Sequence, residues 1–185
     1  MRVLIAFCTR YGATESTSEE IAKVLREEGL EVDVVNLKNE KVKNISDYEV
    51  VIVGAGMQMS RWCKESEKFL NKFQNELREK KHVVFISSAA KAVLEYDGQT
   101  EEMEENWQKW LVDKVDRYSL NPVAISIFGG VWDYNKMGFV FKKTMRPFQM
   151  KLEEVGIPEV EPGVYDTRNW EEIRIWAREL AGKLV

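Results

Sequence analysis

Short apolar runs alternate with amphipathic stretches along most of the chain. The runs at 2–8, 50–55 and 82–88 are almost wholly apolar and rich in Val and Ile, which is typical of strands buried on both faces of a parallel sheet. A fourth run, at 122–128, has the same character, whereas 31–36 alternates apolar and polar residues as a half-buried edge strand does. The pattern therefore predicts five strands.

Apolar residues recur at helical spacing between these runs. We expect helices over 15–28, 64–80, 101–115 and 170–184. Gly29 marks the end of the first helix, and the pair Asn169 and Glu172 is spaced to cap the last one. Strands that alternate with helices predict an α/β fold, a three-layer sandwich with helices on both faces of the sheet.

The segment 129–165 does not fit this alternation. About forty residues separate the fifth strand from the last helix, which is far more than a βα loop needs, so we expect this insertion to carry structure of its own. Its apolar residues are spaced as in a helix, although Pro147 is expected to kink or break that helix. The spaced residues are Phe141, Met145, Phe148, Leu152 and Val155.

The charge of the chain is unevenly distributed. The 185 residues carry a net charge of −4, which gives no general attraction to nucleic acid. Residues 129–151, in contrast, hold five basic residues against one aspartate, interleaved with five aromatic residues. Such a basic-aromatic segment is typical of an element that lies on a membrane surface or covers an apolar substrate; the alternative is that its aromatics simply pack on the sheet.

The composition excludes several classes of protein and of metal site. The length and the hydrophobic content of 44% suit one domain over residues 1–185, and no apolar run approaches the ~20 residues of a membrane span. Cys8, Cys63 and the single His82 are too few for the usual zinc or haem sites or for a disulfide framework. We expect a reduced, cytoplasmic setting, no metal, and both cysteines to serve as small buried side chains without a catalytic role.

The loop after the first strand is the main candidate for chemistry. It reads T-R-Y-G-A-T at 9–14 and leads into a helix, so that backbone N–H groups, two Thr hydroxyls and the helix dipole can hold a phosphate. A Walker loop needs a second glycine and a lysine, and a dinucleotide fingerprint needs three glycines, and both are missing here. As a bare pattern, such a turn can also be only a helix cap.

These residues resemble a known signature. C-T-R-Y-G-A-T after an apolar first strand is similar to the flavodoxin motif, although Tyr11 stands where flavodoxins usually have Thr or Ser. Together with G-A-G-M-Q-M-S-R-W at 54–62, the long basic-aromatic segment and the ending D-T-R-N-W-E-E-I-R-I-W-A-R-E-L-A, the chain resembles the menaquinone-dependent protoporphyrinogen oxidase branch. The resemblance implies a flavodoxin-like fold, with strand order 2-1-3-4-5, and one noncovalent FMN.

The resemblance also implies the residues that bind the cofactor. The first loop would hold the phosphate, and the loops after the third and fourth strands would meet the flavin ring, with Trp62 as the candidate stacking residue. The alternative for the last two loops is that each is an ordinary strand-to-helix turn without a role in cofactor binding. The expected cofactor-binding residues are Thr9, Arg10, Tyr11, Gly12, Ala13, Thr14, Gly56, Met57, Gln58, Met59, Trp62, Ser87, Ser88, Ala89 and Ala90; no catalytic side chain is expected.

The function that the resemblance implies is oxidoreduction through FMN. Electrons would pass from a reduced porphyrin-type substrate to a quinone, while the protein supplies positioning. Residues 129–151 would then make a peripheral contact with the inner face of the membrane. The alternatives are a flavodoxin that carries single electrons between redox protein partners, and a binding protein that has kept the fold and lost the flavin.

Overall fold

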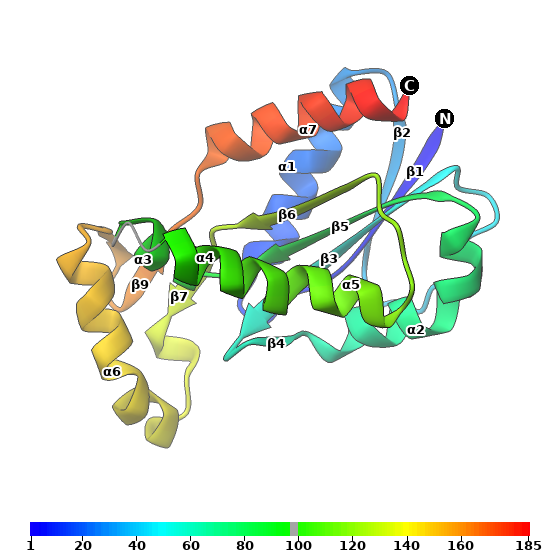
Figure 1. Cartoon of the computed structure of the whole chain (residues 1–185). Helices are drawn as coiled ribbons and strands as arrows, with labels where there is room; N and C mark the ends of the chain where they lie inside the picture. Colours follow the sequence, from blue (N-terminus) through cyan, green and yellow to red (C-terminus); the bar gives the residue numbers. More distant parts are fainter. Residues whose placement is uncertain (97–99) are drawn as a thin grey trace.

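A parallel β-sheet organises the computed structural model, which describes residues 1–96 and 100–185 (Figure 1). The sheet has the order β2-β1-β3-β5-β6, and every neighbouring pair along this path is parallel. Counted along the chain, this is the predicted order 2-1-3-4-5. The strands are β1 (Arg2–Cys8), β2 (Glu31–Asn36), β3 (Val50–Gln58), β5 (Lys81–Ser87) and β6 (Ala124–Phe128).

Helices cover both faces of the sheet. Helices α1 (Ala13–Glu27) and α7 (Trp170–Leu184) pack on one face, and α2 (Lys64–Arg78) and α5 (Asp113–Arg117) lie on the other side (Figure 1). Because successive strand residues point to opposite faces, Val3 and Ile5 join the core under α1 and α7, while Leu4 and Ala6 join the core under α2. The structure therefore confirms the three-layer α/β sandwich.

The predicted helix over 101–115 is interrupted. Helix α4 (Thr100–Trp107) passes into a π-helical turn (Gln108–Val112) before α5 begins. A π turn accommodates more residues than an α turn and so rotates the helix faces that precede it. As a result Trp107 is 36% exposed, whereas Trp110 and Leu111 are buried. A short helix, α3 (Ala90–Tyr96), precedes this region and has no counterpart among the predicted elements.

The insertion after β6 forms a small unit of its own, as its length predicts. Strands β7 (Val131–Asp133), β8 (Glu159–Glu161) and β9 (Val164–Asp166) make an antiparallel sheet in the order β7-β9-β8. Helix α6 (Phe139–Glu154) connects β7 to β8 through a turn of 3-10 helix (Tyr134–Lys136). Figure 1 shows this unit beside the carboxyl ends of the central strands.

Pro147 was expected to kink or break the helical run, and the second of these alternatives is wrong, because α6 continues through this residue. A proline inside a helix removes one hydrogen bond and costs about 3 kcal/mol. Packing of the residues that follow the proline offsets that cost. The Phe148 ring lies 4.4 Å from the Trp132 ring between centroids, and Leu152 is fully buried.

Tyr165 in β9 fastens the carboxyl half of α6 to the small sheet. Its hydroxyl oxygen lies 2.7 Å from Glu153 Oε1 and 2.9 Å from Glu159 Oε1, and it accepts a hydrogen bond of 3.2 Å from Gln149 Nε2. Burial, together with the hydrogen bond to Glu153, raises the pKa of Tyr165 well above its ordinary value. The phenol therefore remains a neutral donor throughout the physiological pH range.

Replacement of Tyr165 by Phe should lower the free energy of unfolding by about 1 to 3 kcal/mol, because the one hydroxyl hydrogen that Glu153 and Glu159 share as acceptors is then lost. The measurement is urea unfolding of both proteins. The matched control is Tyr96→Phe, since Tyr96 is 61% exposed and its substitution should change the stability little. A Tyr165→Phe protein as stable as the wild type would show that this contact does not hold α6.

Candidate functional site

A cavity of about 230 Å³ lies where the carboxyl ends of β1, β3 and β5 meet the insertion. Its walls come from three βα loops, from the π-helical turn and from β7 and α6. Such a position, outside the carboxyl ends of parallel strands, is where doubly wound sheets bind ligands. The lining residues are Thr9, Arg10, Tyr11, Ala13, Thr14, Gly56, Met57, Gln58, Met59, Ser60, Ser87, Ser88, Ala89, Ala90, Trp110, Gly130, Val131, Trp132, Phe141, Met145 and Phe148.

The first loop ends in a helix terminus that opens into this cavity. Gly12 adopts φ +97°, a left-handed conformation that favours glycine, and its N–H donates to Thr9 Oγ1 at 2.9 Å. Helix α1 then begins with no side-chain hydrogen bond at its cap. The hydroxyl of Thr14 is buried and has no hydrogen-bond partner within the described part of the chain. The uncapped N–H groups and this hydroxyl together suit an anionic group.

The second loop is a hairpin. It is not the ordinary strand-to-helix turn that was the alternative for this loop. Strand β3 extends to Gln58, and the two-residue strand β4 (Arg61–Trp62) returns beside it, with Met59 and Ser60 forming the turn at φ +49° and +57°. The side-chain amide of Gln58 donates to the Tyr11 hydroxyl at 3.0 Å. The hairpin is therefore joined to the first loop, and its turn borders the cavity.

The third loop meets the beginning of the insertion. Gly130 fits closely there, because a Cβ atom on it would lie 2.9 Å from the backbone nitrogen of Ala89. The Ser88 N–H donates to the Phe128 carbonyl at 2.9 Å. Ser87 Oγ and Trp132 Nε1 are buried, and neither has a partner among the residues described. These two atoms and Thr14 Oγ1 all belong to residues that line the cavity.

The three unpaired polar atoms at this cavity are suited to contact a ligand. A buried donor or acceptor left unsatisfied costs about 1 to 3 kcal/mol, so several around one cavity are typical of a site whose partner is a bound molecule. A ligand that fits would place an anionic group at α1 and polar atoms near Ser87 and Trp132. The half-buried Phe141, Met145 and Phe148 supply an apolar wall opposite.

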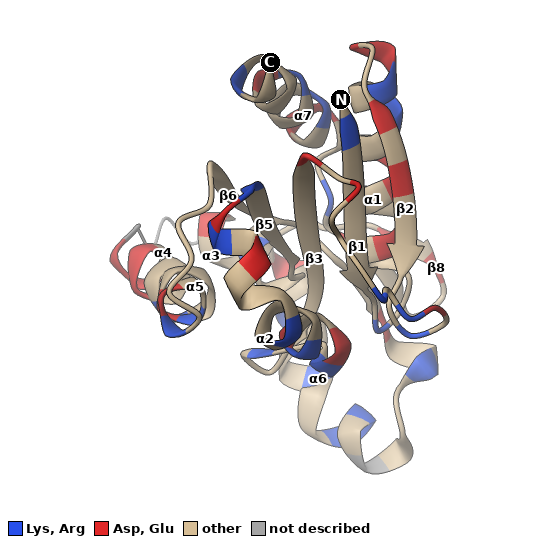
Figure 2. Ribbon diagram, turned by 90° about the vertical axis from the view of Figure 1, so that its right-hand side faces the viewer, with Lys and Arg blue, Asp and Glu red and all other residues tan. Residues whose placement is uncertain are grey.

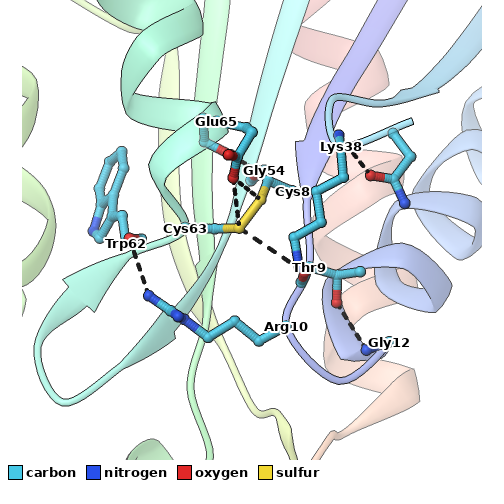
Figure 3. Close-up of a disulfide and its surroundings, with 11 residues drawn as sticks. Cys8, Thr9, Arg10, Gly12, Lys38, Gly54, Trp62, Cys63 and Glu65 are labelled. Atoms are coloured by element: carbon cyan, nitrogen blue, oxygen red, sulfur yellow. Dashed lines mark hydrogen bonds between the residues drawn. A yellow bond between two sulfur atoms is a disulfide. The ribbon is translucent and has the colours of Figure 1, made fainter. Parts of the chain in front are cut away.

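Nearly all of the predicted site residues line this cavity; Gly12 and Trp62 do not. Gly12 contributes to the site through its left-handed backbone conformation, which sets the path of the first loop. Trp62 corrects our expectation, since it is 2% exposed within the core under α2 and points away from the first loop (Figure 3). Its indole N–H donates to the Trp110 carbonyl at 2.8 Å. The aromatic residues at the cavity are instead Tyr11, Trp110, Trp132, Phe141 and Phe148.

Sequence reasoning missed the cavity role of several residues. The basic-aromatic composition of 129–151 allowed a cover over an apolar substrate, but it did not single out Trp132, Phe141, Met145 and Phe148 as residues of the site. Nothing in the sequence placed Trp110 at the site, because its position depends on the π-helical turn and on the Ser60 hydroxyl 3.0 Å from its Nε1. Lys143 and Arg146 of α6 are exposed, and Figure 2 shows basic residues along this helix.

The two cysteines give a second correction. Both are buried, as expected, but they are not independent side chains, because a disulfide joins Cys8 to Cys63 across 55 residues (Figure 3). Spacing along the chain could not reveal this pairing. It arises because β1 and β3 are neighbours in the sheet and the hairpin turns the chain back toward the end of β1.

Comparison with known proteins agrees with this architecture. The chain matches the family described as "Flavodoxin domain" over residues 4–155. Protoporphyrinogen IX dehydrogenase [quinone] of Escherichia coli (strain K12) is 24% identical over 187 residues, which cover 98% of this chain and 95% of that protein.

Two solved structures have a similar fold. Rubredoxin oxygen:oxidoreductase from Desulfovibrio gigas aligns with a TM-score of 0.56 at 16% identity, and the alignment covers 99% of this chain but only 36% of that one. A short-chain flavodoxin associated with a non-canonical PDU bacterial microcompartment aligns with a TM-score of 0.52 at 13% identity, covering 83% of this chain and 97% of the other. The matched residues include four of the five strands of the central sheet, most of β1 and the walls of the cavity, and the chain belongs to the flavodoxin domain family.

Proposed function

We propose that this protein is an FMN-dependent oxidoreductase that passes electrons from a reduced porphyrin-type substrate to a quinone. The observation that carries the proposal is that an anion seat and an apolar wall face the same cavity. The seat consists of the α1 terminus and Thr14, and the wall consists of half-buried side chains of the insertion. The similarity to an E. coli protein named protoporphyrinogen IX dehydrogenase [quinone] supports the choice of substrates.

The residues present fit FMN. The α1 amides and the Thr14 hydroxyl would hold the phosphate, and Arg10 would add a positive charge beside it. Ser87 and Trp132 would meet polar atoms of the ring system, which would satisfy their unpaired groups. FMN is favoured over a dinucleotide because the loop at 9–14 forms one phosphate seat and the chain has no dinucleotide fingerprint.

The protein would contribute binding and positioning to the reaction. Bound FMN supplies the chemistry of accepting electrons from one substrate and giving them to another. The hairpin and the third loop would orient the ring, and the Gln58–Tyr11 hydrogen bond holds the hairpin against the first loop. Phe141, Met145 and Phe148 would exclude water and contact an apolar substrate on the open side.

The insertion would bring the site to a membrane-dissolved quinone. Within the described residues, no helix combines the length and the apolar character needed to cross a bilayer. The basic residues Lys142, Lys143 and Arg146 lie on α6, the helix whose other side lines the cavity. Each would add about 1 kcal/mol of attraction near an anionic membrane surface. A cytoplasmic protein that contacts the membrane peripherally fits this arrangement.

The purified protein should contain one FMN per chain, and Thr14→Ala should weaken FMN binding by about 1 to 3 kcal/mol, because a phosphate oxygen loses its donor. The measurement is quenching of flavin fluorescence. Thr17→Ala is the matched control, since Thr17 lies on the same helix, is equally buried and does not line the cavity. A colourless protein that takes up no added FMN would refute the proposed cofactor, and equal effects of the two variants would place the phosphate elsewhere.

Changing Lys142, Lys143 and Arg146 together to Gln should abolish binding to anionic vesicles and slow the reduction of vesicle-dissolved quinone, because the attraction to the surface is lost. FMN content should stay the same, since none of these residues lines the cavity. The matched control changes three exposed basic residues of α1 and α7, Lys23, Arg178 and Lys183.

The quinone assay also separates the two functions considered from the sequence. Anaerobic reduction of the bound flavin by protoporphyrinogen, followed by its reoxidation by menaquinone, is the turnover expected of the enzyme. If the triple variant reduces quinone in vesicles as fast as the wild type, the insertion does not serve membrane contact. If neither half-reaction proceeds although FMN is bound, the electron-carrier function is favoured instead.

A further inference from the structure

The disulfide lies directly behind the two loops that face each other across the cavity. Cys8 is the last residue of β1 and immediately precedes the first loop, and Cys63 lies between β4 and the first residue of α2. The Cα atoms are 5.8 Å apart, and Cys63 Sγ lies 3.9 Å from the Thr9 carbonyl oxygen. The bond therefore fastens the loop that would hold the phosphate to the hairpin that would hold the ring (Figure 3).

We propose that Cys8 and Cys63 form a reversible thiol–disulfide redox site whose oxidised form holds these two loops together and strengthens FMN binding. The effect on FMN rests on the proposed function, whereas the redox site itself does not. The site lies outside the cavity lining, since neither cysteine borders the cavity, and it is separate from the residues expected to contact the flavin.

Glu65 is the observation that points to a reversible pair. Its Oε2 atom lies 3.3 Å from Cys8 Sγ and 3.7 Å from Cys63 Sγ, within hydrogen-bonding reach of sulfur. A disulfide has no S–H to donate and does not use such an acceptor. A reduced pair does, because the carboxylate accepts a hydrogen bond from a neutral thiol and repels a thiolate. The carboxylate therefore favours the protonated dithiol, at a place where the two sulfurs are also close enough to bond.

The exchange reaction balances with a small dithiol as the reductant. One thiolate of the dithiol attacks a cysteine sulfur, the S–S bond breaks, and the released cysteine takes up a proton. The second thiol of the reagent then displaces the other cysteine, which is protonated in turn. Two electrons and two protons have moved to the protein, and the reagent leaves as its own disulfide. A low-molecular-weight disulfide reverses the same steps.

Reduction should loosen the site because the cross-link constrains backbone that the loops share. Without the bond, the contacts that remain between the first loop and the hairpin include the 3.4 Å contact between Arg10 Nη2 and the Trp62 carbonyl and the Gln58–Tyr11 hydrogen bond. Both cysteine residues are buried, Cys8 completely and Cys63 with 3% of its surface exposed, so a reductant reaches them only when the loops move apart. Bound FMN opposes that movement, and FMN binding and disulfide formation should therefore favour each other.

The test compares the full-length protein after oxidation by diamide and after reduction by dithiothreitol. Alkylation under denaturing conditions, with a zinc chelator present, should trap no thiol in the oxidised protein and two in the reduced protein. Fluorescence quenching should show that the reduced form binds FMN about tenfold more weakly. By linkage, saturating FMN should shift the midpoint of the thiol–disulfide couple about 30 mV more negative.

Two variants sharpen the test. Cys8→Ser with Cys63→Ser should bind FMN with the affinity of the reduced protein, whether or not an oxidant is present. Glu65→Gln should let the reduced pair react faster with iodoacetamide at a fixed pH, because the repulsion of the thiolate is removed. If the double variant does not fold, the comparison of oxidised and reduced wild-type protein decides the question alone.

Three results would overturn the proposal. The first is two trapped thiols after oxidation, and the second is release of a bound metal by the chelator with no disulfide formed, since the ligand atoms of Cys8, Cys63 and Glu65 lie within 4.8 Å of one another. The third is equal FMN affinity in the two forms. If neither form binds FMN, the proposed function fails, and so does the proposed effect of the disulfide on FMN binding. The number of trapped thiols still tests the redox site itself.

Discussion

The close approach of Gly56 to the first loop is the constraint on which the site depends. A Cβ atom at this position would lie 3.0 Å from Thr14 Oγ1 and 3.3 Å from the Arg10 nitrogen, so a larger residue would push the end of β3 away from the loop. Because this contact is possible, the α1 terminus, the Thr14 hydroxyl and the hairpin reach the same cavity. The anion seat and the surface for a flat ligand are thereby held side by side.

The insertion is tied to this seat through one arginine. Arg168 follows β9, donates to both carboxylate oxygens of Asp166 at 2.8 and 2.6 Å, and also contacts the Ser16 hydroxyl in the first turn of α1. Burial raises the pKa of Asp166, but the hydrogen bonds from Arg168 outweigh it and hold that pKa below its ordinary value. The stabilisation from this pair is therefore present at neutral pH and is lost as the pH falls through the lowered pKa. Arg168 thus links the insertion, which carries the apolar wall, to helix α1, which carries the anion seat.

Sequence patterns predicted the parts of the molecule that depend on local periodicity. The bounds of β1, β2 and α7 agree with the expected ranges, because buried parallel strands and amphipathic helices leave clear patterns. The loop at 9–14 was found for the same reason, since its glycine and Thr residues stand between a strand and a helix. Most of the site residues that were predicted from this local pattern therefore line the cavity.

The features that could not be predicted depend on contacts between distant segments. The side to which Trp62 turns is decided by the hairpin pairing of Met57 with Trp62, and Cys8 meets Cys63 only once that hairpin has formed. Pro147 is tolerated because the helix around it packs on Trp132, a residue of another element. The three-residue strands of the insertion are too short to show a period of two.

The central claim is that the cavity holds its ligand through a phosphate at the α1 terminus. The most direct measurement compares the dissociation constants of FMN and riboflavin, which have the same ring system and differ in the phosphate. Charge-assisted hydrogen bonds contribute about 1.5 to 3 kcal/mol each, so the loss of two of them should weaken binding by a factor of about 100 or more. The account predicts that FMN binds more tightly by at least that factor. Equal affinities for FMN and riboflavin would contradict it.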